Sequence, residues 1–107
     1  MTHQFRGSYG VTVTPFTEDG KKIDIAAWKR FVDWQIDQGS PGIIILGTTG
    51  EFLTLTDDER TQFVEATIKH VRKRMHVLVG TMNAYTPNAV RYRREAEKLG
   101  AEGLTII

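Results

Sequence analysis

Four short apolar runs alternate along this chain with three longer stretches in which apolar residues recur at helical spacing. The short runs are rich in β-branched residues and are bounded by glycines or turn-forming residues, which is typical of strands. These four predicted strands are Tyr9–Thr14, Gly42–Leu46, Val77–Val79 and Gly103–Ile107. The second contains four consecutive large aliphatic residues, and this run predicts a strand buried on both faces.

The first predicted helix follows Asp24, a good N-cap residue, and ends at Gly39, with Pro41 just beyond it. Its apolar face consists of Trp28, Phe31, Val32 and Ile36. The second predicted helix opens with a capping box, in which Thr56 and Glu59 satisfy each other's backbone amides. Its apolar stripe consists of Phe63, Val64, Ile68, Val71 and Met75.

The third predicted helix has Thr86 as its N-cap, Pro87 at its first helical position and Gly100 after its end. Its shared face consists of Ala89, Tyr92, Ala96 and Leu99. The resulting order, β-α-β-α-β-α-β, favours parallel strands joined by right-handed crossovers, with helices covering the sheet. The fold class is therefore α/β.

The length of the chain, 107 residues, suits one small domain. A closed (β/α)8 barrel needs about 250 residues, and this chain holds about half of its strands. An open parallel sheet with an apolar final strand at its edge would tend to pair with other chains. We therefore expect residues 1–107 to be the N-terminal portion of a single barrel domain; the alternative is a complete small open α/β sheet.

Composition narrows the possible partners. Fourteen basic and thirteen acidic residues give a formal net charge of +1, which favours no nucleic acid partner. The chain has no cysteine, and its three histidines lack ligand spacing, so we expect no metal site. No apolar run approaches the ~18 residues that span a bilayer, and the N-terminus is too polar for a signal peptide. We expect a cytoplasmic protein that does not bind membranes.

The candidate site is the run Gly47-Thr-Thr-Gly-Glu51, directly after the second strand. In parallel α/β sheets, ligands bind beyond the carboxyl ends of the strands. Gly47 and Gly50 allow close approach and positive φ, and consecutive amides in such a turn can bind an anion. The hydroxyls of Thr48 and Thr49 can donate to a carboxylate or phosphate. This chemistry fits a small anionic metabolite; the alternative is that both threonines only satisfy amides of the turn.

The motifs of the chain resemble the N-terminal part of the dihydrodipicolinate synthase / N-acetylneuraminate lyase family, over essentially all 107 residues. The segments that carry the resemblance are Gly10–Phe16, Gly42–Glu51, Leu53–Arg60, Gly80–Thr81 and Gly100–Gly103. The resemblance implies a (β/α)8 TIM barrel, of which this chain would supply about the first three and a half βα units. It also implies a class I aldolase mechanism, in which a lysine forms a Schiff base with pyruvate or another 2-oxo acid that then reacts with an aldehyde.

By this resemblance, Thr49 would bind the carboxylate of the 2-oxo acid through its hydroxyl and its amide. Thr48 would be catalytic, because it would hydrogen-bond a catalytic tyrosine and join a proton relay. Gly47 and Gly50 would allow the substrate to approach closely, and Glu51 is assigned only a structural role. The resemblance implies no cofactor and a homo-oligomer.

The chain lacks the parts of the family pattern that perform the chemistry. The resemblance places the Schiff-base lysine on a sixth strand, the catalytic tyrosine on a fifth and an aromatic pair after the fourth. We therefore predict that the isolated 107-residue chain is inactive. The alternatives are a non-catalytic truncated half-barrel or remnant with a structural or interaction role and, among enzymes, a sugar-acid aldolase or dehydratase.

Three surface features have simpler interpretations. The basic cluster His70–Arg74 is expected at a helix C-terminus, facing water, rather than on a nucleic acid. Trp34 lies off the apolar stripe, and we expect it to pack on a neighbouring helix rather than mark a subunit contact. Tyr85 follows the third strand, where it would line the pocket or reach a neighbouring subunit.

Overall fold

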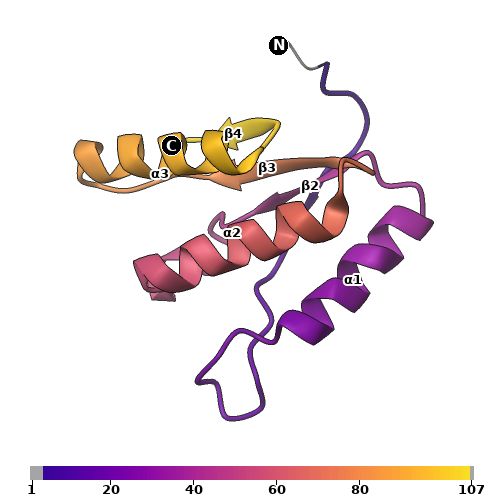
Figure 1. Ribbon diagram of the computed structural model, residues 1–107, viewed down its shortest axis with the longest axis horizontal. Helices are drawn as coiled ribbons and strands as arrows, with labels where there is room; N and C mark the ends of the chain where they lie inside the picture. Colours follow the sequence, from indigo (N-terminus) through magenta and orange to yellow (C-terminus); the bar gives the residue numbers. More distant parts are fainter. Residues whose placement is uncertain (1–3, 107) are drawn as a thin grey trace.

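The computed structural model describes residues 4–106 as a four-stranded parallel sheet with three helices (Figure 1). Its main elements, in chain order, are β1 (Gly10–Val11), α1 (Ile25–Asp37), β2 (Gly42–Ile45), α2 (Asp57–Val71), β3 (His76–Gly80), α3 (Thr86–Leu99) and β4 (Gly103–Thr105). A short 3-10 helix, η1 (Phe52–Thr54), precedes α2. The predicted alternation of strands and helices is confirmed.

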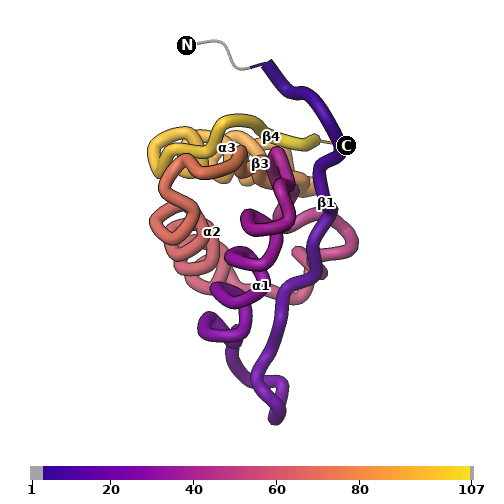
Figure 2. Tube along the Cα trace, turned by 90° about the vertical axis from the view of Figure 1, so that its right-hand side faces the viewer, coloured from indigo at the N-terminus to yellow at the C-terminus, as the bar shows by residue number. Residues whose placement is uncertain are grey.

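The strands are ordered β1-β2-β3-β4 across the sheet, and all three pairings are parallel. Right-handed crossovers between strands in sequential order place every connecting helix on the same face. Figure 2 shows this arrangement, with α1, α2 and α3 on one side and β1 on the other. The chain thus forms three and a half consecutive βα units, an arrangement consistent with part of a (β/α)8 barrel.

The hydrophobic core lies between the sheet and the three helices. Ile43 and Ile45 of β2 and Val77 and Val79 of β3 are buried in the core. The helical residues buried with them are Trp28, Val32, Phe63, Val64, Val71 and Ala96. The predicted apolar faces of all three helices therefore do pack inward.

The helix-free face of the sheet is also apolar. The register aligns Val11, Ile44 and Leu78 in one row across β1, β2 and β3, and these residues are exposed or half-buried. Val13 continues this exposed apolar face beyond β1. Parallel sheets are normally covered on both faces, and in (β/α)8 barrels such rows form the packed interior.

Strand ends differ from prediction because a strand continues only where its neighbour pairs with it. β1 is limited to Gly10–Val11 rather than Tyr9–Thr14, although the Thr12 amide still donates to Ile44 O at 3.0 Å. β3 is longer than predicted at both ends, because His76 pairs with Gly42 of β2 and Gly80 pairs with Thr105 of β4. β4 ends at Thr105, opposite the end of β3, and Ile107 lies outside the described residues.

The N-cap of α1 and the capping box of α2 are confirmed. Asp24 accepts from the amide of Ala27, and Thr56 and Glu59 satisfy each other's amides. The predicted cap of α3 is wrong: the helix begins at Thr86, and Tyr85 is the N-cap. The reason is the Asn83 side chain, which accepts from the Tyr85 amide and turns the chain into the helix one residue early.

The second helix ends four residues before Met75, which was predicted on its stripe. Arg72 and Lys73 both adopt the left-handed conformation, with φ of 50° and 61°. The guanidinium of Arg74 then donates to the last-turn carbonyls of His70 and Val71. Met75 is still buried, but from the loop before β3. The expected position of the basic cluster at a helix C-terminus is therefore confirmed.

Among the helices of residues 4–106, none combines the length and the apolar character needed to span a bilayer.

The left-handed turn generates a prediction. Lys73→Gly should stabilise the chain by about 0.5–1 kcal/mol. Glycine removes the steric cost of the left-handed backbone, and this gain exceeds the extra conformational entropy that glycine loses on folding. Urea denaturation measures the change in the free energy of unfolding. Lys29→Gly is the control: Lys29 is an exposed residue inside α1, where glycine should destabilise by a similar amount. A loss of stability in Lys73→Gly would contradict this account of the turn.

Candidate functional site

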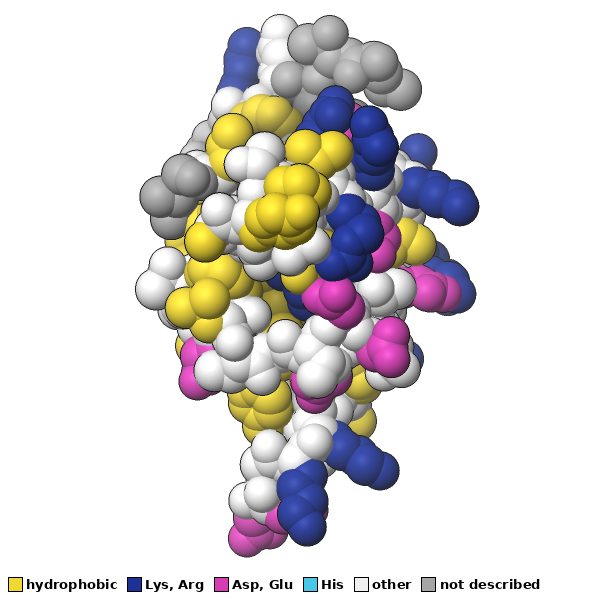
Figure 3. All heavy atoms as spheres, turned by 90° about the vertical axis from the view of Figure 1, so that its left-hand side faces the viewer, with side chains coloured by type: hydrophobic (Ala, Val, Ile, Leu, Met, Phe, Trp, Pro, Cys, Tyr) yellow, Lys and Arg dark blue, Asp and Glu magenta, His cyan; other side chains and the backbone are white. Residues whose placement is uncertain are grey.

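The predicted site run lies at the carboxyl end of β2, as the sequence requires. Residues 46–51 leave the strand and fold into a turn before η1. Figure 3 views the molecule toward this end of the sheet, where hydrophobic side chains gather at the left and centre and charged ones mainly at the right and below. Leu53 and Tyr85, which follow β2 and β3, are among the exposed large hydrophobic residues of the chain.

The conformation of the turn corrects one expectation. Gly47 and Gly50 do not adopt positive φ; the left-handed residues are Leu46 and Glu51, which flank the turn with φ of 58° and 57°. Leu46 ends the strand abruptly, and the Glu51 amide donates to Thr48 O at 3.0 Å to close a β-turn. Two bulky residues therefore provide the reversals that were expected of the glycines.

Gly50 is needed for space rather than for its dihedral angle. A Cβ there would lie 3.1 Å from the Leu46 nitrogen and 3.2 Å from the Thr12 carbonyl oxygen, both rigid backbone atoms. At Gly47 the nearest heavy atom would be Val11 Cγ1, at 3.9 Å, an ordinary contact. Gly50 must therefore lack a side chain, because its Cα lies close to backbone atoms of Leu46 and Thr12.

Thr48 and Thr49 are both exposed. Within residues 4–106, neither hydroxyl hydrogen-bonds to another group, and the Thr49 amide donates to no acceptor. The alternative interpretation, in which both threonines serve only to satisfy turn amides, is therefore not what the structure displays. At the turn the chain presents two free hydroxyls and a free amide to solvent, and these are the donors that a carboxylate accepts.

A neighbouring glycine sets the position of the turn against β3. Gly80 ends β3, and a Cβ there would overlap the carbonyl oxygen of Leu46. The Gly80 carbonyl accepts from Nη2 of Arg60, a residue of α2, at 3.0 Å. The ends of β2 and β3 are therefore held close together by a backbone contact that only glycine allows.

Arg60 is a buried cation, with 4% of its surface exposed. Its guanidinium stacks 3.9 Å above the Tyr92 ring, and its Nε and Nη1 have no hydrogen-bond partner within the described chain. Burial lowers the pKa of Arg60. A cavity of about 100 Å³ lies beside it, lined by Phe52, Leu53, Leu55, Arg60, Met82, Asn83 and Tyr92. The two threonines of the candidate site are not among these lining residues.

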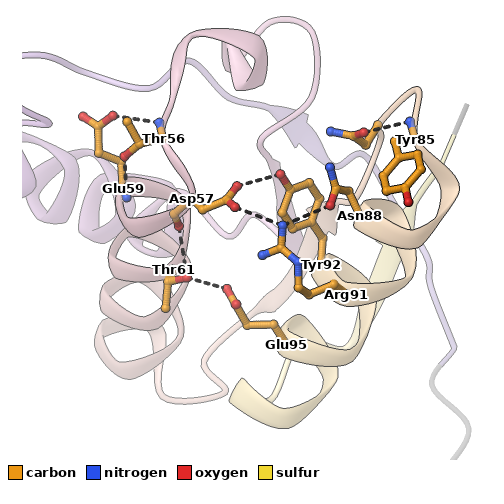
Figure 4. Close-up of polar contacts among 10 residues, drawn as sticks. Thr56, Asp57, Glu59, Thr61, Tyr85, Asn88, Arg91, Tyr92 and Glu95 are labelled. Atoms are coloured by element: carbon orange, nitrogen blue, oxygen red, sulfur yellow. Dashed lines mark hydrogen bonds and ion pairs between the residues drawn. The ribbon is translucent and has the colours of Figure 1, made fainter.

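A polar network joins the start of α2 to α3 beside this cation (Figure 4). The carboxylate of Asp57 accepts from the Tyr92 hydroxyl at 2.7 Å and from the Arg91 guanidinium at 2.9 Å. The Tyr92 bond, followed by the Arg91 bond, lowers the pKa of Asp57. The hydrogen bond between Tyr92 and Asp57, followed by burial, raises the pKa of Tyr92. The network links the two helices that follow β2 and β3.

The two aromatic residues of open role are both largely exposed. The side chain of Trp34 lies against Phe31 of its own helix, with ring centroids 6.2 Å apart, and 55% of its surface is exposed. The expected packing of Trp34 on a neighbouring helix is therefore not observed. Tyr85 is 63% exposed at the start of α3 and is not among the residues that line the cavity. Figure 4 shows its ring away from the Asp57 network.

Sequence reasoning missed two residues that support this end of the sheet. Arg60 lies at helical spacing with Phe63, Val64 and Thr67, so an arginine inside an apolar stripe was a visible signal. Thr14 is buried, and its hydroxyl donates to the carbonyl of Gly50 at 2.7 Å. The polar threonines alternating with Val11 and Val13 were the corresponding signal in the first strand.

Comparison with known proteins gives consistent matches. The model of the dihydrodipicolinate synthetase family matches residues 4–107. A curated relative, the 4-hydroxy-tetrahydrodipicolinate synthase of Acidiphilium cryptum, is 43% identical over 103 residues, which cover 96% of this chain and 35% of that protein. The chain thus spans about a third of the length of such relatives.

Two solved structures are similar to this chain. The crystal structure of dihydrodipicolinate synthase from Aquifex aeolicus has a TM-score of 0.90 and 34% identity, and the match covers 95% of this chain and 34% of that one. YagE is a prophage protein of the dihydrodipicolinic acid synthase family from E. coli, solved in complex with pyruvate. It has a TM-score of 0.91 and 31% identity, with 97% and 35% covered.

The packing of Gly50 generates a prediction. Gly50→Ala should destabilise the chain by about 1–3 kcal/mol, because the added methyl forces backbone atoms apart. Gly47→Ala is the matched control and should cost clearly less, since its methyl meets only Val11 at an ordinary distance. Thermal or urea unfolding of the two variants compares them. Equal losses would show that the close approach at Gly50 is not what constrains the turn.

The Asp57 network generates a prediction on pH. Because the pKa of Asp57 is lowered in the folded state, its contribution to stability is complete above the unfolded value of about 3.9 and is lost as pH falls through the folded pKa. Asp57→Asn should therefore destabilise the chain at pH 7, with a difference that shrinks below about pH 4. Asp58→Asn, one residue along the same exposed turn, is the control, with a smaller loss at pH 7. A difference for Asp57→Asn that is independent of pH would contradict the role of this carboxylate.

Proposed function

Because the chain belongs to the dihydrodipicolinate synthetase family, we propose that residues 1–107 are the N-terminal portion of a barrel enzyme that forms a Schiff base with pyruvate or a related 2-oxo acid. The observation that carries the proposal is the turn at the carboxyl end of β2. It presents the Thr49 hydroxyl, the Thr49 amide and the Thr48 hydroxyl without internal partners. The whole protein would be a pyruvate-dependent lyase or synthase of the dihydrodipicolinate synthase type.

The role of Thr49 follows from its two donors. A carboxylate accepts hydrogen bonds from a hydroxyl and a backbone amide when both point toward it from one residue. The turn fixes that residue between a left-handed Leu46 and a left-handed Glu51, so the donors lose little freedom when the acid binds. Gly50 lets the same turn pack against the Thr12 and Leu46 backbones, and Gly47 at its start keeps bulk away from the carboxylate.

Thr48 is the residue that we propose for proton transfer. A hydroxyl can accept one proton while it gives another, so it can link a catalytic tyrosine to a further group. The tyrosine, and the lysine whose amine condenses with the keto carbon with loss of water, are supplied by strands beyond the four described here. The lysines of this chain lie in the Lys21–Lys22 turn, on helices or in the loop after α2, and none follows the end of a strand.

The apolar helix-free face supports the barrel context of this proposal. The row Val11, Ile44 and Leu78 is only partly covered by residues 4–106, although such a row is normally buried in a barrel interior. Four further strands would cover it and would pair with the outer edges of β1 and β4. An aldehyde as the second substrate and a homo-oligomeric state remain predictions from the family resemblance, and a cytoplasmic location remains a prediction from the composition and the polar N-terminus.

A substitution tests the carboxylate site. In a chimera, residues 4–106 replace the matching segment of the Acidiphilium cryptum synthase. Thr49→Val keeps the side-chain shape and removes the hydroxyl. The KM for pyruvate should rise about tenfold to a hundredfold, since a hydrogen bond to a charged group contributes about 1.5–3 kcal/mol. Thr49→Ser, which retains the hydroxyl, is the control and should stay near the parent value. An unchanged KM in Thr49→Val would remove Thr49 from the site.

Trapping with borohydride separates the enzyme from a non-catalytic half-barrel. The parent chimera should form a covalent adduct with pyruvate, whereas the 107-residue chain alone should form none. The readout is the intact mass of each protein after reduction. A stoichiometric adduct on the isolated chain would overturn its predicted inactivity, and a chimera without an adduct would overturn the proposed function.

A further inference from the structure

The turn that carries Thr48 and Thr49 has weak internal support. Within it, the one backbone hydrogen bond runs from the Glu51 amide to Thr48 O, and the residues on both flanks are left-handed without being glycine. Each such residue is intrinsically unfavourable, so contacts from elsewhere must hold the conformation. The origin of that support determines what keeps the Thr49 donors in place.

The support comes from the segment that follows β1. Thr14 is 4% exposed, and its hydroxyl donates to the Gly50 carbonyl at 2.7 Å. Within residues 4–106, no other side chain outside residues 46–55 hydrogen-bonds to this turn. The Gly50 Cα packs beside the Thr12 carbonyl oxygen, as the 3.2 Å approach of a Cβ there shows. The segment after β1 therefore contacts both the Cα and the carbonyl oxygen of Gly50.

The hydrogen bond from Thr14 is made to the residue next to Thr49, so it can control the orientation of the Thr49 hydroxyl and amide. Gly50 directly follows Thr49, and together they are the two central residues of the β-turn that Thr48 and Glu51 close. Without the Thr14 hydroxyl, the Gly50 carbonyl would be a buried acceptor with no partner, which proteins avoid by rotating the peptide toward water. That rotation changes the turn at Thr49 and lowers the fraction of molecules that can bind the acid.

We infer that Thr14 is a positioning residue for the 2-oxo acid site: its hydroxyl holds the Gly50 carbonyl, and thereby holds the Thr49 hydroxyl and amide in the orientation that binds the substrate carboxylate. This inference rests on the proposed function. Thr14 does not touch the substrate, and it acts through the backbone of the turn.

Thr12 provides a closely matched control. It lies two residues earlier on the same segment, is equally buried, and its hydroxyl also donates to a backbone carbonyl, that of Ile44, at 3.1 Å. That carbonyl keeps a second donor, the Thr12 amide, and it belongs to β2 rather than to the turn. Thr12→Val therefore removes the same kind of bond without releasing Gly50.

The experiment compares three variants in the chimera with the Acidiphilium cryptum synthase. Thr14→Val should raise the KM for pyruvate about tenfold, with a smaller change in kcat, because fewer molecules hold the binding conformation. Thr14→Ser keeps the hydroxyl and should restore a KM within about twofold of the parent, and Thr12→Val should do the same. Hydrogen exchange of the Glu51 amide in the 107-residue chain should quicken in Thr14→Val but not in Thr12→Val.

The outcomes separate this inference from the function on which it rests. A parent chimera that forms no pyruvate adduct overturns the proposed function, and the inference falls with it. An active chimera in which Thr14→Val keeps the parent KM overturns the inference alone. Equal rises in KM for Thr14→Val and Thr12→Val, or a Thr14→Ser variant as impaired as Thr14→Val, would show a general loss of stability and would also overturn it.

Discussion

The contact between the backbones of Leu46 and Gly80 is the constraint on which the site depends. Gly80 has no room for a Cβ because the Leu46 carbonyl oxygen occupies that space. The two strand ends can therefore approach each other. β2 stops at Ile45, because the next residue, Leu46, is left-handed and turns the chain away from β3. Arg60 reinforces the contact from α2 by donating to the Gly80 carbonyl. The turn with the two threonines begins directly after this contact, so the contact sets the position of the turn.

The first strand is a minor part of the sheet, and the segment that follows it supports the threonine turn. Its ladder is two residues long, yet the segment after it contributes two buried threonines on the side that faces β2 and the turn. Valines at alternate positions point to the helix-free face. An isolated amphipathic strand would bury its valines and expose its threonines. The reversed burial follows because the Thr12 hydroxyl donates to the carbonyl of Ile44 in β2 and the Thr14 hydroxyl donates to that of Gly50 in the turn.

Local patterns were enough to predict the order of the elements, the parallel sheet and the place of the threonine turn. Each depends on residues close in sequence, such as the Thr56–Glu59 capping box or the aliphatic run before Gly47. The failures have distant or conformational causes. Thr14 meets Gly50 across 36 residues, and nothing local indicates that pairing. The second helix was predicted too long because Arg72 and Lys73 adopt left-handed angles that are rare for residues of their type. Asn83 moved the start of α3 through a side-chain bond to Tyr85.

The strand order has a consequence for how the molecule reaches its native state. Every strand pairs only with the strands next to it along the chain, so no pairing reaches beyond one βα unit. Units of this kind can fold progressively from the N-terminus during synthesis. The bonds from Thr14 to Gly50 and from Glu51 to Thr48 lie within the first 51 residues. The anchored turn can thus begin to form early in synthesis, and docking of β3 completes it.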